Sequence, residues 1–160
     1  MPITNGTKED IQDIIPLFQS FFPKHNIFQL NQDQVKEYLE TEMQKHQLLI
    51  IKEQETNKDK RITAASFIVK TGESSNQEHT RWKFRHFAFT NEEAGKELLA
   101  ACEEYIKKQS KTVKIELTIS ENESSLEFFE QQGYQKEGTL TNHYRWNETC
   151  FILAKSFQSE

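Results

Sequence analysis

The apolar positions near the start of the chain recur at three- and four-residue spacing, which predicts one helical stripe. Its members are Ile11, Ile14, Ile15, Phe18, Phe21 and Phe22. Thr7 stands three residues before Asp10, the pattern of a capping box at a helix start. Pro23 predicts the end of this helix, because proline cannot continue the backbone hydrogen bonding. A second helix is predicted from near Asn31 to His46 by a similar stripe.

Alternation of apolar and polar residues replaces this helical spacing in the middle of the chain. A short strand is predicted around 2–5, and three antiparallel strands are predicted at 48–53, 61–70 and 81–89, with the polar segment ETNKDK joining two of them. In the strand 81–89, strict alternation predicts one face made by Trp82, Phe84 and His86. Phe87 and Phe89 then make the second face apolar, so that face is expected to become buried towards the strand end.

The last third of the chain returns to helical spacing and then alternates again. A helix is predicted after Thr90, where Thr90 and Glu93 have the spacing of a capping box. The strand 112–120 follows this helix and is therefore expected to run parallel to 81–89. A short helix from Asn122 to Gly133 and two strands, 134–145 and 148–157, complete the chain, with a hairpin turn at Trp146 and Asn147.

Composition and charge limit the kind of protein. The 160 residues, 35% of them hydrophobic, suit a single domain spanning 1–160 with one core. The net charge of -5 argues against nucleic-acid binding, which needs a basic face. No stretch approaches the ~18 apolar residues of a membrane span, and there is no secretion signal. A cytoplasmic protein with two buried free thiols, Cys102 and Cys150, is expected, and the histidine spacing implies no metal site.

Three local motifs then carry a resemblance to a known family. In ENESSLEFFEQQGY, five positions fall in register with the pattern N-x-x-A-x-x-x-Y-x-x-x-G-F: Asn122, Ser125, Phe129, Gly133 and Tyr134. The other two motifs are HFAF at the end of the strand 81–89 and GKELL at 95–99. With the order of elements, these motifs resemble the GNAT superfamily of acyl-CoA-dependent N-acyltransferases over essentially the whole chain.

The resemblance implies a fold, a cofactor and a reaction. The fold would be α/β, with a mixed, mostly antiparallel sheet, helices on both faces, and a splayed central strand pair at 81–89 and 112–120. The acyl donor would be acetyl-CoA, and the acceptor would be an amine of a small molecule or peptide that attacks the thioester directly. The resemblance assigns cofactor binding to Phe87, Phe89, Gly95, Lys96, Asn122 and Phe129. The sequence does not fix the oligomeric state, and a homodimer is one option.

Two departures from the family pattern leave the function open. The diphosphate loop keeps only Gly95 among its glycines, and Glu92 and Glu93 would face the phosphates. Phe129 stands where the family often has a tyrosine that protonates the leaving thiolate, and phenylalanine has no hydroxyl. The alternative to the enzyme is a non-catalytic binding or regulatory module with this fold that has lost acyl-CoA binding.

Two residues are candidates for proton transfer. His86 is the first candidate for the base that deprotonates the amine, and a core-lining strand histidine is the competing interpretation. Tyr144, expected in a half-buried hairpin strand, is the candidate for the hydroxyl that Phe129 lacks, and simple packing is the competing interpretation.

Overall fold

The structure is a computed structural model that describes residues 3–54 and 60–159. Pro2 and most of the expected ETNKDK connection therefore lie outside the described residues. The chain divides into two compact units, residues up to 69 with 85–103, and 70–84 with the residues from 104 onwards. The strands are β1 (Ile3–Asn5), β2 (Gln47–Gln54), β3 (Lys60–Glu73), β4 (His79–Phe89), β5 (Thr112–Ser120), β6 (Gln135–Thr141) and β7 (Thr149–Gln158). The helices are α1 (Ile11–Phe21), α2 (Gln32–Lys45), α3 (Glu92–Lys107) and α4 (Ser125–Gln131), with short 3-10 turns at Lys8–Asp10 and Asn26–Gln29.

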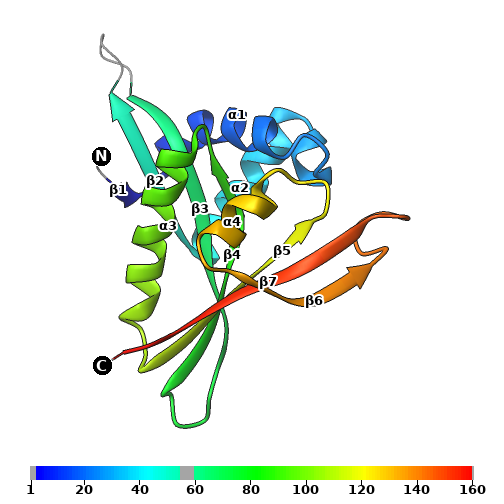
Figure 1. Ribbon diagram of the computed structural model, residues 1–160. Coiled ribbons are helices and arrows are strands. Elements are labelled where there is room, and N and C mark those ends of the chain that lie inside the picture. Colours follow the sequence, from blue (N-terminus) through cyan, green and yellow to red (C-terminus); the bar gives the residue numbers. More distant parts are fainter. Residues whose placement is uncertain (1–2, 55–59, 160) are drawn as a thin grey trace. The chain divides into compact units, whose positions relative to one another are not determined.

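The seven strands form a mixed, mostly antiparallel sheet in the order β1-β2-β3-β4-β5-β7-β6 (Figure 1). β2 pairs antiparallel with β1 and β3, and β7 pairs antiparallel with β5 and β6. β4 and β5 are parallel, as predicted from the helix that joins them. Their register runs from His79 opposite Thr112 to Lys83 opposite Glu116 and goes no further among the described pairs.

The first unit has helices on both faces of its strands. Leu48 and Ile50 of β2 pack in one core with α1 and α2, whose buried members include Phe18 and Leu39. Because side chains alternate along a strand, the equally buried Leu49 and Ile51 point to the other face. Figure 1 shows α3 crossing that face, and the buried stripe of α3 covers it. The predicted start of the first helix is confirmed, since Thr7 N–H donates to Asp10 Oδ2 at 2.8 Å.

The alternation predicted for β4 is wrong at one residue. His86 has φ of +58° in the middle of the strand, a left-handed conformation that interrupts the pleat. As a result Arg85 and His86, although consecutive, both contact α2. Arg85 Nη1 lies 2.8 Å from Glu42 Oε2, and His86 Nε2 lies 2.7 Å from Tyr38 Oη. Phe84 instead packs with aromatic rings of the second unit, so His86 does not share its face.

Two element boundaries also differ from the prediction. α4 begins at Ser125 with Ser124 as its N-cap residue, so Asn122 does not cap it. β6 ends at Thr141 and β7 begins at Thr149, so a seven-residue loop, 142–148, replaces the predicted tight hairpin. Asn142 and Asn147 both have positive φ, and Asn142 Oδ1 accepts the N–H of Asn147 at 2.8 Å. The amide side chain thus closes the loop early, because asparagine tolerates this backbone conformation.

Candidate functional site

His86 combines a strained backbone with a reactive side chain. A left-handed φ is uncommon for residues other than glycine and costs of the order of 1–3 kcal/mol, so the surrounding fold must hold it. Such strain clusters at active sites and ligand clamps. The observation therefore favours the functional interpretation of His86 over that of an ordinary strand residue.

Aromatic rings surround the imidazole of His86. Ring centroids lie within 6.4 Å for Phe18, Phe22, His25, Phe28, Tyr38 and Phe67. Phe18 and Phe67 are fully buried, whereas Phe22, His25 and Tyr38 are half-buried. The imidazole thus lies at the boundary between the core of the first unit and its surface. His25 Nδ1 accepts the N–H of Ile27 at 3.2 Å, so a neutral His25 carries its proton on Nε2.

Tyr38 provides the polar contact of this aromatic group. Its hydroxyl lies 2.7 Å from His86 Nε2, within the range of a short hydrogen bond. Burial, and then the carboxylate of Glu42, raise the pKa of Tyr38 to about 12, although Arg85 acts in the opposite direction. The phenol therefore keeps its proton at neutral pH.

A charged group lies next to the Tyr38–His86 pair on the same two elements. Glu42 is 8% exposed and pairs with Arg85 at 2.8 Å, while His46 Nε2 lies 3.5 Å from the same carboxylate oxygen. Tyr38 and Glu42 of α2 and His46, the C-cap residue of that helix, follow one another at four-residue spacing, so they form one polar row. This row was missed by sequence reasoning, and the i, i+4, i+8 spacing was the available signal.

The predicted cofactor residues of the first unit lie on either side of the turn between β4 and α3. Phe87 is buried, and the half-buried Phe89 packs its ring 5.0 Å from that of Phe21. The turn that follows is anchored to β3, since Thr90 N–H donates to Thr63 carbonyl O at 2.8 Å. Lys96 is exposed one turn into α3.

The start of α3 has a different cap from the predicted one. Asn91, rather than Thr90, caps the helix, because Asn91 Oδ1 accepts the N–H of Ala94 at 2.9 Å. The buried Gly95 donates its N–H to the carbonyl of Asn91 at 3.1 Å. Two of the backbone donors that the family resemblance assigns to a diphosphate thus already have partners. Glu92 and Glu93 are exposed in the first turn.

The remaining predicted cofactor residues, Asn122 and Phe129, belong to the second unit. Asn122 is exposed between β5 and α4, and its N–H donates to Ser120 Oγ at 3.3 Å. Phe129 is 1% exposed and packs among the rings of Phe84, Phe128 and Tyr134. Asn122 is thus accessible to a ligand, whereas Phe129 contributes packing.

Tyr144 lies in the loop 142–148 and is 57% exposed, so its predicted place in a half-buried strand is wrong. Glu123, which sequence reasoning did not single out, is a half-buried carboxyl of the same unit. Burial, followed by the charge of Glu148, raises its pKa to about 7. Glu148 is itself 8% exposed and pairs with Arg145 at 3.3 Å. The sequence gave little indication that Glu123 and Glu148 lie close together, because these residues belong to two separate loops.

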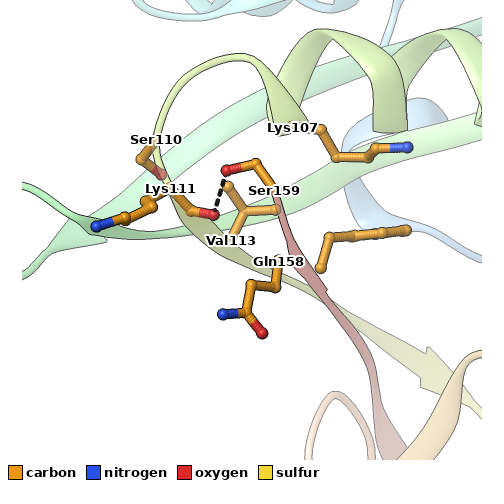
Figure 2. A pocket seen from close by; sticks show the side chains of 7 residues that line it. Lys107, Ser110, Lys111, Val113, Gln158 and Ser159 are labelled. Atoms are coloured by element: carbon orange, nitrogen blue, oxygen red, sulfur yellow. Dashed lines mark hydrogen bonds between the residues drawn. The ribbon is translucent and has the colours of Figure 1, made fainter.

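A small hollow at the C-terminal end of α3 belongs to no predicted site. Figure 2 shows that it is lined by Lys107, Ser110, Lys111, Val113, Phe157, Gln158 and Ser159. Ser159 Oγ closes one side by donating to the carbonyl of Lys111 at 2.8 Å. Its volume of about 40 Å³ accommodates water rather than a cofactor, since ligand pockets measure roughly 300–1,000 Å³.

No helix in residues 3–54 and 60–159 has both the length and the apolar character needed to cross a bilayer. Over the same residues, no group of three His, Cys, Asp or Glu side chains is placed to hold a metal ion.

Comparison with known proteins gives structural neighbours but no sequence relatives. No protein-family model matches the chain, and no curated protein matches it. An aminoglycoside 6'-N-acetyltransferase solved in complex with coenzyme A is similar, with a TM-score of 0.71, 15% identity, and coverage of 100% of this chain and 99% of that one. The aminoglycoside 6'-N-acetyltransferase from Enterococcus faecium gives a TM-score of 0.70 at 13% identity, with coverage of 100% and 99%. Ribosomal-protein-alanine N-acetyltransferase from Brucella melitensis gives 0.66 at 13% identity, with coverage of 98% and 100%.

Proposed function

The chain has the fold of the GNAT N-acetyltransferases, and from this premise we propose that it is an acyl-CoA-dependent N-acyltransferase. It transfers an acetyl group from acetyl-CoA to an amine of a small molecule or peptide by direct attack on the thioester. The observation that carries this proposal is the end-to-end match with a neighbour solved in complex with coenzyme A. Because fold alone does not determine function, residues of this chain must supply the rest of the argument.

The cofactor contacts in this proposal come mainly from the backbone and from small polar groups. Phe87 and Phe89 offer backbone groups to the pantetheine arm, in the manner of an added strand. The described pairing of β4 with β5 supports this, since it stops at Lys83, before these residues. Lys96, exposed on the first turns of α3, offers a cation to the diphosphate, and Asn122 offers an amide.

The chemistry requires one proton to leave the amine and one to reach the departing thiolate. His86 is the proposed base, supported by its strained backbone and its partly buried imidazole. Phe129 cannot donate a proton. Tyr144 is the proposed acid, supported by the exposure of more than half of its side chain. Partial burial of the phenol raises the pKa of Tyr144, so the phenol stays protonated.

A second candidate function is a binding or regulatory module with this fold that does not hold acyl-CoA. The start of α3 favours this alternative, because Asn91 satisfies the N–H of Ala94 and two carboxylates stand in the first turn. A carboxylate there stabilises the helix dipole and, by the same field, disfavours a bound anion.

Calorimetric titration with acetyl-CoA separates the two functions. The transferase predicts saturable binding at one site per chain, with a dissociation constant roughly in the 1 μM–1 mM range in which the KM values of enzymes fall. Acetyl-pantetheine, which lacks the nucleotide and its diphosphate, is the control ligand, and its binding should be weaker. Absence of heat with acetyl-CoA, from a chain that circular dichroism shows to be folded, would favour the module.

A further inference from the structure

The donor and acceptor roles in the hydrogen bond between Tyr38 and His86 depend on the tautomer of His86. His86 Nε2 is the only hydrogen-bond partner of the Tyr38 hydroxyl in the part of the chain that the structure describes. If Nε2–H donated to the phenol oxygen, the phenol proton would have no acceptor among these residues. Donation from the phenol to Nε2 satisfies the O–H and leaves the oxygen lone pairs able to accept a proton. A neutral His86 then carries its proton on Nδ1.

When the phenol donates to His86 Nε2, the acceptor amine meets the oxygen of Tyr38 rather than this nitrogen of His86. The lone pair of Nε2 is covered by the Tyr38 hydroxyl, so a proton reaches that nitrogen through the phenol. We propose that Tyr38 is a third catalytic residue beside His86 and Tyr144, a proton relay that takes a proton from the acceptor amine and passes its own proton to His86. This proposal rests on the transferase function proposed above and deepens it.

The relay balances without an ionised tyrosine. As the amine nitrogen forms its bond to the thioester carbonyl carbon, an amine N–H bond breaks and its proton goes to Tyr38 Oη. At the same time the phenol proton moves along the hydrogen bond to His86 Nε2, which lies 2.7 Å from Tyr38 Oη and becomes the imidazolium. The C–S bond then breaks, and its electron pair leaves on the CoA sulfur. The imidazolium later returns its proton to water, which restores the starting state.

A free tyrosinate is not a competing base. Burial and the nearby Glu42 carboxylate raise the pKa of Tyr38 to about 12, so almost no phenolate exists at neutral pH. The relay avoids this barrier because Tyr38 is neutral before and after the step.

Several charged and titratable groups face the pair from the packed elements. Glu42 and His46 come from α2, Arg85 comes from β4, and His25 precedes the turn Asn26–Gln29. The Glu42 carboxylate favours the imidazolium that forms, whereas the Arg85 guanidinium, paired with it at 2.8 Å, opposes it. The ring of His25 lies 5.1 Å from that of His86, so protonation of one disfavours protonation of the other.

The first experiment tests the direction of the hydrogen bond without measuring activity. Two-bond ¹H–¹⁵N correlation NMR of the histidine ring reports which nitrogen carries the proton. In the wild type at high pH, His86 should be the Nδ1–H tautomer, and Y38F should shift it towards Nε2–H. A wild type in the Nε2–H form, or a tautomer unchanged in Y38F, would overturn the relay.

The second experiment measures turnover of acetyl-CoA with three amines: 2-phenylethylamine, spermidine and an alanine-starting tripeptide. Y38F should lower kcat for the fastest of these amines by about 10²–10⁴-fold, the usual contribution of general acid–base catalysis. The KM for acetyl-CoA should stay within about twofold, since the phenol makes no contact with the donor in this proposal. Y105F is the matched control, because Tyr105 is also a half-buried helical tyrosine and packs against Trp82.

The outcomes separate the relay from the transferase. An active wild type whose kcat survives Y38F would overturn the relay and leave the transferase standing. A wild type inactive with all three amines would overturn the transferase for these acceptors, and with it the catalytic role of Tyr38. Loss of kcat in Y38F, with normal folding and the predicted tautomer change, supports both.

Discussion

At the scale of single residues, His86 contributes through its backbone and its side chain in separable ways. The left-handed φ of +58° turns Arg85 and His86 to the same helix, so that two consecutive residues of β4 contact Glu42 and Tyr38. Replacing His86 with alanine or glycine removes the imidazole equally, and only the freedom of the backbone then differs between the two variants.

This difference makes a stability prediction. H86G should be more stable than H86A by about 1 kcal/mol, because glycine adopts a left-handed φ without the Cβ clash that alanine suffers. Chemical denaturation of both variants measures the difference. K83A and K83G are the control pair at a regularly paired position of the same strand, and there alanine should be the more stable residue. The same order at both positions would contradict strain at His86.

The choice of His86 as a candidate came from its residue type, while its face was predicted wrongly. An alternating sequence does not reveal where a strand interrupts its pleat unless a glycine or asparagine stands at that position. Position 86 is a histidine, so the left-handed backbone there could not be predicted. Tyr38 packs against the core of the first unit from α2, but its hydrogen bond to His86 depends on the left-handed backbone of His86. Local sequence therefore identified His86 as a candidate but not its contact with Tyr38.

At the scale of elements, the loops before α4 and β7 bring the carboxyl groups of Glu123 and Glu148 close enough for the charge of Glu148 to raise the pKa of Glu123. The half-buried Glu123 precedes α4, and the 8% exposed Glu148 precedes β7. The folded-state pKa of Glu123, about 7, lies above its ordinary value of 4.5. The stabilisation that Glu123 contributes is therefore complete below pH 4.5 and is lost as the pH rises through about 7.

E123Q should reproduce the protonated carboxyl at every pH. Relative to the wild type, we expect it to be more stable by roughly 1–3 kcal/mol above pH 8, after allowance for solvent screening of a partly exposed group. The gain should disappear near pH 4, where the wild-type carboxyl is protonated. Unfolding free energies across this range test the expectation, and E130Q, on an exposed position of α4, controls for the change in net charge. A constant difference between wild type and E123Q at all pH values would contradict the raised pKa.

At the scale of the whole molecule, the order of elements was predictable because each has its own periodicity. The amphipathic stripes of α1 and α3 and the alternation in β5 required no tertiary information, and the helix between β4 and β5 implied their parallel pairing. The loop 142–148 was not predictable, because the Asn142–Asn147 hydrogen bond that closes it spans five positions and competes with a tighter turn.

Net charge is also a property of the whole molecule, and it bears on the proposed cofactor. A chain with a net charge of -5 disfavours the approach of a polyanion such as CoA, and Glu92 and Glu93 concentrate that effect at the start of α3. E92Q/E93Q should tighten acetyl-CoA binding by about two- to fivefold per charge at low salt. The gain should shrink between about 0.01 M and 1 M salt, as the Debye length falls from ~30 Å to ~3 Å.

Calorimetry of the wild type and the double variant at both salt concentrations measures this effect. E103Q/E104Q, near the other end of the same helix, is the control for net charge alone. Equal tightening by both double variants would show that position on the helix is irrelevant, and no binding by any variant would favour the cofactor-free module.

The burial of the two thiols has a practical consequence for an assay that detects free thiols. Cys102 and Cys150 have no exposed surface, and burial raises the pKa of both, so the folded chain presents no thiolate to a chromogenic disulfide reagent. In the proposed reaction, by contrast, the thiol of CoA appears only as the acyl group departs. With the folded chain, the colour that develops would therefore measure CoA release without a background from the protein's own thiols. Denaturant added at the end would release two thiols per chain and calibrate the enzyme concentration in the same cuvette.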